Sequence, residues 1–313
     1  MARRASLSVA GLTLALDSPY RLDLQSLSEC YRPFLGSPGV DPPEEVLIPV
    51  RIEVGDPPRP SDRVTVFDTG DSWVLSRDGQ NYYLTLHPHR PSGPELWTAV
   101  ISRDLRQVTV HCSAAATVRQ ADGVALAPPL SYPLDQLLWM YLLSFHQGAL
   151  VHAAGVMRRG KGLLLPGKSG AGKSTLASQL AGREGFRVLS DDRIAVRKIS
   201  GRFLAYGTPW PGDQGAALNE SVPLSGMYFL RHAEADEIVP LPPREAAERL
   251  LPATSVPWFD PEPMARVVQV LNDLVAWVPA FELRFRPGPD VVALLEGHTD
   301  GPPRRRRRHS EGI

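Results

Sequence analysis

The sequence predicts an α/β (α+β) protein in which a β-rich N-terminal accessory domain, residues 1–130, precedes an α/β domain, residues 131–300. Before residue 130, short runs rich in β-branched and aromatic residues alternate with turn sequences such as DTGD and RDGQ, which is typical of hairpins. Beyond it, apolar strands alternate with helical segments. A Gly-rich segment, residues 167–174, stands between an apolar strand and a helix, as phosphate-binding loops do.

Composition indicates an ordinary globular protein. The chain has 313 residues, of which 43% are hydrophobic and 22% charged, enough to bury a core. Lys and Arg number 34, as do Asp and Glu, but residues 304–313 hold five Arg and one Glu, so the rest of the chain has 29 basic and 33 acidic residues. This balance argues against a nucleic-acid partner. The Arg-rich tail, residues 301–313, is expected to be disordered.

The sequence also argues against a membrane-spanning protein and a disulfide-stabilised protein. No apolar run reaches the roughly 18 residues of a membrane span. Residues 1–20 have a broken apolar stretch, which favours a first strand over a signal peptide. Two cysteines, Cys30 and Cys112, are too few for a disulfide framework and lack zinc-site spacing. We therefore expect a cytoplasmic protein.

The N-terminal domain is predicted to consist of short strands without a catalytic constellation. His87 and His89 lie close together, but two histidines without a third ligand are typical of a loop. Loops rich in Pro, Gly and acidic residues are expected at 37–46 and 56–62. The expected strands are residues 64–67, 72–76, 81–86, 96–102 and 107–113.

The second domain is predicted to begin with a buried helix, residues 134–145, which follows Pro133 and is apolar nearly all round. A hairpin then turns at residues 158–160 and leads into the Gly-rich segment and the helix after it. The remaining expected elements are strands at 186–190, 194–198, 202–207, 281–287 and 291–295 and helices at 243–251 and 263–278.

The Gly-rich segment fits the pattern G-x-x-x-x-G-K-[ST] with the required strand before it and helix after it. Glycines let the backbone bend so that N–H groups point at phosphates, and the helix N-terminus adds partial positive charge. Lys173 is expected to reach the β- and γ-phosphates, and Ser174 to coordinate magnesium. The predicted nucleotide-binding residues are Gly167, Lys168, Ser169, Gly170, Ala171, Gly172, Lys173, Ser174 and Thr175.

Two adjacent aspartates, Asp191 and Asp192, follow the strand at 186–190. An acid at this position is a second anchor for the metal in many phosphate-loop proteins. Of two adjacent carboxylates, one can hold the metal while the other accepts a proton from an attacking hydroxyl. Without the Gly-rich segment, an exposed acidic turn would be the better interpretation.

His152 is the third candidate. If residues 151–157 and 161–166 pair about the turn, the partner numbers sum to about 319, which places His152 beside Gly167. An isolated histidine in an apolar strand is usually a core residue, but this register gives a functional interpretation equal weight, since histidine handles protons near pH 7.

The string from Val151 to Arg193 resembles the C-terminal catalytic domain of HPr kinase/phosphorylase and its relatives. In that family a histidine, a strand hairpin, a P-loop and an Asp-Asp pair follow one another in the same order. The match covers roughly residues 148–198 and continues more loosely to about 295. The resemblance implies a P-loop domain with a mixed, largely antiparallel sheet, similar to phosphoenolpyruvate carboxykinase.

The resemblance also implies roles for individual residues. Asp191 would be the general base on a substrate hydroxyl, Asp192 and Ser174 would hold magnesium, and His152 would tune the aspartate. Because HPr kinases are hexamers, a homo-oligomer is implied as well.

The chain departs from the member that phosphorylates HPr. Thr175 stands where that protein has Glu, and a Glu-containing signature beyond the aspartates is replaced by TPWPGD, residues 208–213. Within this segment, Trp210 could stack on a nucleobase, but a core position is favoured because tryptophan is usually highly buried. The HPr-kinase-like proteins with this pattern include lasso-peptide kinases, which phosphorylate a serine, and enzymes acting on small hydroxyl compounds.

We therefore expect an ATP- and magnesium-dependent kinase that phosphorylates a hydroxyl, foremost a serine of a peptide or protein. Asp191, His152 and Lys173 are its expected catalytic residues. Two alternatives remain open at this stage. One is a P-loop nucleotide-binding or ATPase module without kinase activity that acts in an assembly. The other is a kinase of small hydroxyl compounds.

Overall fold

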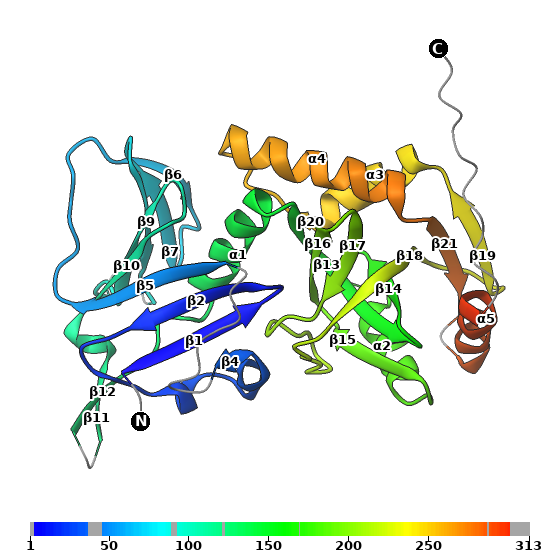
Figure 1. Cartoon of the computed structure of the whole chain (residues 1–313), viewed down its shortest axis with the longest axis horizontal. Coiled ribbons are helices and arrows are strands. Elements are labelled where there is room, and N and C mark those ends of the chain that lie inside the picture. Colours follow the sequence, from blue (N-terminus) through cyan, green and yellow to red (C-terminus); the bar gives the residue numbers. More distant parts are fainter. Residues whose placement is uncertain are drawn as a thin grey trace.

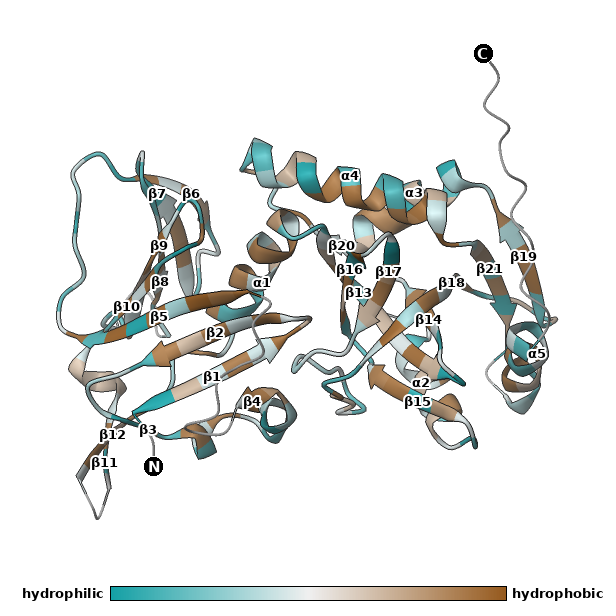
Figure 2. Cartoon of the chain, viewed as in Figure 1, coloured by the Kyte–Doolittle hydropathy of each residue, from teal (hydrophilic) through white to brown (hydrophobic). Residues whose placement is uncertain are grey.

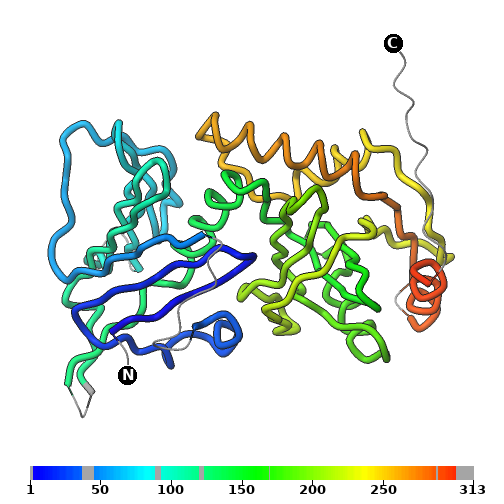
Figure 3. Tube along the Cα trace, in the orientation of Figure 1, coloured from blue at the N-terminus to red at the C-terminus, as the bar shows by residue number. Residues whose placement is uncertain are grey.

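The protein is a mixed α/β structure in which strands dominate (Figure 1). The structure has two nine-stranded sheets, the first built from the N-terminal part of the chain and the second from the C-terminal part. The chain trace shows these two parts side by side (Figure 3). No helix among the described residues is long and apolar enough to cross a membrane. The computed structural model describes residues 3–36, 46–88, 93–120, 123–168, 170–286 and 288–300.

The first sheet runs in the order β4-β1-β2-β5-β10-β9-β8-β7-β6. Apolar and polar residues alternate along several of its strands, as in β5 (LIPVRIEV), so one face can pack on a core (Figure 2). Its strands are β1 (Arg4–Val9), β2 (Leu12–Asp17), β4 (Leu35–Gly36), β5 (Leu47–Val54), β6 (Val64–Asp68), β7 (Trp73–Arg77), β8 (Asn81–Leu86), β9 (Trp97–Ser102) and β10 (Val108–Cys112). A small sheet, β11 (Thr117–Gln120), β12 (Gly123–Leu126) and β3 (Arg21–Leu22), lies beside it.

The five strands predicted between residues 64 and 113 are confirmed within a residue or two as β6 to β10. Residues 4–17 form two strands where one was expected. His87 follows β8 as a loop residue, whereas His89 lies outside the described residues. The predicted tail, residues 301–313, also lies outside them.

Helix α1 (Leu134–Phe145) joins the two sheets, and the prediction of a buried helix here is confirmed. Its apolar side chains belong to the core of the first sheet, while the helix also packs on β13 (Gly148–Arg158) and α4 (Pro261–Trp277) of the second. Trp139, fully buried, donates from its indole N–H to the Val9 carbonyl oxygen at 3.0 Å. The helix is therefore fixed to both parts of the chain.

The second sheet runs in the order β14-β13-β16-β17-β18-β21-β19, with β15 and β20 also paired to β13. The pairs β14–β18 and β18–β21 are parallel and the others antiparallel, so the expected mixed, largely antiparallel sheet is observed. The remaining strands are β14 (Lys161–Pro166), β15 (Phe186–Ser190), β16 (Arg193–Ile199), β17 (Arg202–Tyr206), β18 (Ser221–His232), β19 (Glu237–Leu241), β20 (Thr254–Ser255) and β21 (Ala280–Phe285).

Helices cover two faces of this sheet with separate apolar cores. Helices α3 (Pro243–Leu250) and α4 pack on one core. Helices α2 (Lys173–Ala181) and α5 (Pro289–Asp300) pack on the other. Burial on both sides explains the near-continuous apolar sequences of β13 and β14.

One sequence-based expectation is wrong here, and two strands of this sheet were not predicted. Residues 291–295 were expected to form a strand but lie inside α5, because a short apolar run has no periodicity that separates strand from buried helix. Pro289 and Asp290 in the first turn favour a helix start. The long strand β18 and its neighbour β19 were not anticipated.

Candidate functional site

The Gly-rich segment connects the end of β14 to the first residue of α2. Gly170 and Gly172 have φ values of 81° and 91°, a left-handed conformation that L-residues with side chains rarely adopt. Ser169 lies outside the described residues. Since α2 begins at Lys173, its N-terminal N–H groups and partial positive charge lie at this segment.

The predicted hairpin register is confirmed. Ala153 pairs with Pro166 and Ala154 with Leu165, so partner numbers sum to 319. The Gly167 N–H donates to the His152 carbonyl oxygen at 3.2 Å. The backbone of β13 therefore fixes His152 beside the first residue of the Gly-rich segment.

Lys173 is folded back onto this segment. Its Nζ donates to the carbonyl oxygens of Gly167 at 2.8 Å and Lys168 at 3.0 Å, and the residue is only 5% exposed. Burial lowers the pKa of this amine, and the nearby Asp192 carboxylate partly opposes the shift. The ammonium group can exchange these carbonyl partners for the oxygens of an anion that enters the segment.

His152 and Asp192 form a close pair. The imidazole Nε2 lies 2.8 Å from Asp192 Oδ1, and the Ala153 N–H donates to the Asp192 carbonyl oxygen at 2.9 Å. Burial, followed by the charge of Lys173, lowers the pKa of His152 despite the opposing effect of Asp192. At neutral pH the imidazole is therefore uncharged and donates its Nε2–H to the carboxylate.

Asp191 has a different environment, although it adjoins Asp192 in the chain. Its side chain is buried, and its two oxygens accept backbone N–H groups of Gly212 at 2.9 Å and Gln214 at 3.0 Å. Asp191 therefore lacks the open position that its implied role as general base on a substrate hydroxyl requires. The reason is topological: β15 and β16 both pair with β13, so the two-residue connection runs along β13, and there it is Asp192 that contacts His152.

The segment 207–214 is anchored to the interior. Trp210 is 5% exposed, so the core interpretation of this residue is confirmed. Its indole N–H donates to Asp135 Oδ2 at 2.6 Å, and the Tyr31 hydroxyl donates to the same carboxylate. Burial raises the pKa of Asp135 to about 6. Trp210 is therefore held to α1, and Gly212 and Gln214 are held by Asp191.

Of Arg193, Arg231 and Arg244, Arg193 is the one that contacts the Asp192 carboxylate. Arg193 lies 3.3 Å from Asp192 Oδ2 through its Nε and donates to Ser255 Oγ at 3.2 Å. Arg231 pairs with Glu282, and Arg244 with Glu248.

Sequence reasoning missed two rings beside the Gly-rich segment, His232 and Phe285. A Cβ placed on Gly172 would lie 3.2 Å from Phe285 Cζ and 3.5 Å from His232 Cε1. The available signal was the pair of polar residues, Arg231 and His232, that follows the apolar run of β18, but that strand itself was not predicted.

Ser174 and Asp192 are the two residues that were expected to hold magnesium. The hydroxyl of Ser174 and the carboxylate of Asp192 are hard oxygen donors, which Mg²⁺ prefers. Within the described part of the chain, no group of three or more His, Cys, Asp or Glu residues could hold a metal.

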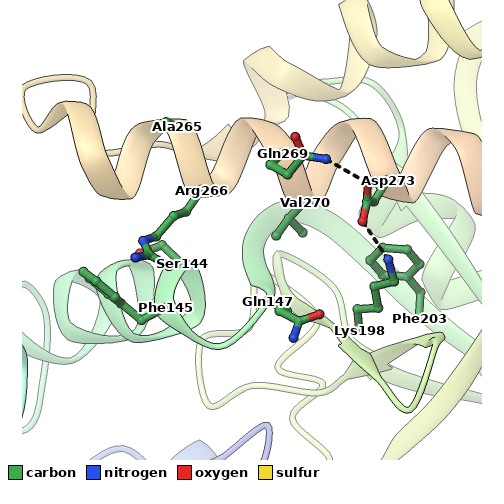
Figure 4. A pocket seen from close by; sticks show the side chains of 10 residues that line it. All are labelled: Ser144, Phe145, Gln147, Lys198, Phe203, Ala265, Arg266, Gln269, Val270 and Asp273. Carbon is green, nitrogen blue, oxygen red and sulfur yellow. Dashed lines mark hydrogen bonds and ion pairs between the residues drawn. The ribbon is translucent and has the colours of Figure 1, made fainter.

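A cavity of about 460 Å³ lies away from these residues, between α1, α4 and the β16–β17 hairpin (Figure 4). Lys198, which pairs with Asp273 at 2.7 Å, is five residues along β16 from Arg193, a strand distance of roughly 17 Å at 3.3–3.4 Å per residue. We place the site at the Gly-rich segment because the polar side chains with chemistry suited to phosphate converge there.

A family model and several solved structures resemble parts of this chain. The sequence model of a family described as "SynChlorMet cassette protein ScmC" matches residues 135–285, from the start of α1 to the end of β21. A solved structure described as the Hpr(Ser) kinase/phosphatase from Coxiella burnetii is similar with 15% identity and a TM-score of 0.31, covering 48% of this chain and 87% of that chain. No curated protein matches.

Proposed function

We propose that the protein is an ATP- and magnesium-dependent kinase that transfers the γ-phosphate to a hydroxyl group, foremost a serine of a peptide or protein. The proposal rests on one observation: a single residue, His152, contacts both the Gly-rich segment and Asp192. His152 accepts a backbone hydrogen bond from Gly167 and contacts Asp192 with its side chain. A carboxylate suited to hydroxyl chemistry is thereby held beside a phosphate-loop sequence. The sequence resemblance to HPr kinases supports the same conclusion.

In this proposal, residues 167–175 form the phosphate loop. The N–H groups of the loop and of the first turn of α2 surround the β- and γ-phosphates. Lys173 exchanges its two carbonyl partners for phosphate oxygens and neutralises charge as the phosphoryl group moves. Ser174 supplies the protein's hydroxyl ligand to magnesium, and the bound ion would offset charge on the β- and γ-phosphates.

We assign proton acceptance to Asp192 rather than Asp191. The acceptor oxygen bonds to the γ-phosphorus, the bond to the β–γ bridging oxygen breaks, ADP leaves, and the hydroxyl proton passes to the Asp192 carboxylate. His152 orients that carboxylate through its Nε2–H. The alternative division, with Asp191 as base and Asp192 on the metal, would require Asp191 to release two backbone hydrogen bonds and leave its buried position.

Radiolabel transfer tests the proposal. The protein is incubated with MgATP labelled in the γ-phosphate and with serine peptides, alanine-substituted controls and small hydroxyl compounds, in parallel with Asp192→Asn. We expect label on a serine hydroxyl with the wild type and almost none with the variant. Release of free phosphate without any labelled acceptor would instead identify an ATPase module, and label only on small compounds would change the acceptor class.

A further inference from the structure

Two stacked rings border the phosphate-loop sequence on the side opposite to His152. His232 ends β18 and Phe285 ends β21, and the two residues are register partners in this parallel pair. Their ring centroids lie 5.4 Å apart with an interplanar angle of 30°. Phe285 is fully buried whereas His232 is exposed, so Phe285 supports an imidazole ring that faces solvent.

Both rings reach the loop itself. A Cβ on Gly172, the residue before Lys173, would lie 3.2 Å from Phe285 Cζ and 3.5 and 3.7 Å from His232 Cε1 and Nε2. Strands β14, β18 and β21 are parallel, so their carboxyl ends meet at one edge of the sheet, where ligands bind in α/β folds. The imidazole is therefore in position to touch a molecule held by the loop.

The order of strands in the sheet predicts which way a bound nucleotide points. His152, on β13, and Asp192, in the connection beside it, lie on one side of β14, and β18 with β21 lies on the other. If phosphoryl transfer occurs beside Asp192, the γ-phosphate points toward β13. The nucleoside end must then leave the loop toward β18 and β21.

We propose that His232, supported by Phe285, is the platform on which the nucleobase of the bound nucleotide stacks. This inference rests on the proposed function, since it needs a nucleoside triphosphate in the loop. Every base has a π-face, so an aromatic ring binds it without reading its hydrogen-bonding edge. The same imidazole could instead hydrogen-bond a phosphate, and the two roles make different predictions.

Binding of two ligands to four proteins distinguishes base stacking from a phosphate contact. Binding of MgATP and of magnesium tripolyphosphate, which has the phosphates but no nucleoside, is measured by calorimetry. The proteins are the wild type, His232→Ala, His232→Gln and His232→Phe. Stacking predicts that Ala and Gln weaken MgATP binding about 5- to 30-fold, within the range for a base on an aromatic ring, and that Phe restores it. Tripolyphosphate binding should stay unchanged in all four.

Different results would contradict the stacking role, the platform or the proposed function itself. Equal weakening of both ligands in His232→Ala, or full retention of MgATP binding in His232→Gln, would assign the imidazole to phosphate contact or to no contact and overturn the stacking role. If MgATP and tripolyphosphate bind the wild type but no His232 variant changes either affinity, the platform is wrong while the phosphate loop stands. If the wild type binds neither ligand, the proposed function fails and this inference with it.

Discussion

His152 Nε2 lies 2.8 Å from Asp192 Oδ1, while the carbonyl oxygen of the same histidine accepts the Gly167 N–H at 3.2 Å. One residue of β13 thus holds both the carboxylate and the first residue of the Gly-rich segment. The contact with Gly167 depends on the register of the β13–β14 hairpin, and the contact with Asp192 depends on how β15 and β16 pair with β13. The relative position of the two functional groups is therefore set by the sheet rather than by loops.

The two aspartates should differ in what their substitution damages. In Asp191→Asn one amide NH₂ would face a backbone N–H, which costs about 1–3 kcal/mol for an unsatisfied buried group. Denaturant unfolding should show this loss, and much less in Asp192→Asn. Asp192→Asn should instead lose phosphoryl transfer at near-wild-type stability. Equal losses of stability and activity in the two variants would contradict the assignment.

Gly212 should matter for activity because of the space it leaves. A Cβ at this position would lie 2.9 Å from Asp191 Oδ2 and 3.3 Å from Asp192 Cβ. Gly212→Ala should displace the aspartates and lower kcat roughly 10- to 100-fold, the cost of misplacing a reacting group by about 1 Å. Gly79→Ala is the matched control, because a Cβ there meets nothing within 4 Å. A Gly212→Ala enzyme with wild-type kcat would exclude this crowding.

The pH dependence should reflect the lowered pKa of His152. Burial and Lys173 favour the neutral imidazole and Asp192 opposes them, so His152 stays neutral down to below its ordinary pKa of about 6.5. The midpoint of any His152-dependent fall in activity should therefore lie below pH 6.5. The stability contributed by the neutral imidazole is likewise complete above about 6.5 and decreases as the pH falls further. A His152-dependent decline centred above pH 6.5, absent in His152→Ala, would contradict this.

The indole of Trp210 should stabilise the fold through Asp135. Trp210→Phe removes the N–H that donates to the buried carboxylate at 2.6 Å, and we expect a loss of about 1–3 kcal/mol in the free energy of unfolding. Trp258→Phe is the control, since Trp258 is 59% exposed. Similar unfolding midpoints for the two variants would show that the Asp135 contact contributes little.

Much of the site could be predicted from sequence because its parts are close together along the chain. The hairpin register followed from a tight turn between two apolar runs, and it placed His152 beside Gly167 correctly. The partner of His152 could not be predicted in the same way. Which of two neighbouring aspartates meets the histidine depends on how β15 and β16 pair with β13, and that depends on long-range pairing.

Contacts between residues far apart along the chain could not be predicted from the sequence either. Trp210 meets Asp135 and Tyr31 across large separations, and His232 meets Gly172 only because β18 lies parallel to β14. Residues 291–295 illustrate a local limit, since a short apolar run is compatible with both strand and helix.

Calorimetric titration of MgATP into the wild type, Lys173→Ala and Lys198→Ala tests the phosphate loop most directly. Lys198 is the matched lysine, because it pairs with Asp273 beside the cavity away from the Gly-rich segment. We predict magnesium-dependent binding that Lys173→Ala weakens at least about tenfold, the effect of losing a charged hydrogen bond to phosphate, while Lys198→Ala binds as the wild type does. A wild type that binds no MgATP, or a Lys173→Ala variant with unchanged affinity and an intact fold, would contradict the assignment of this segment as the nucleotide site.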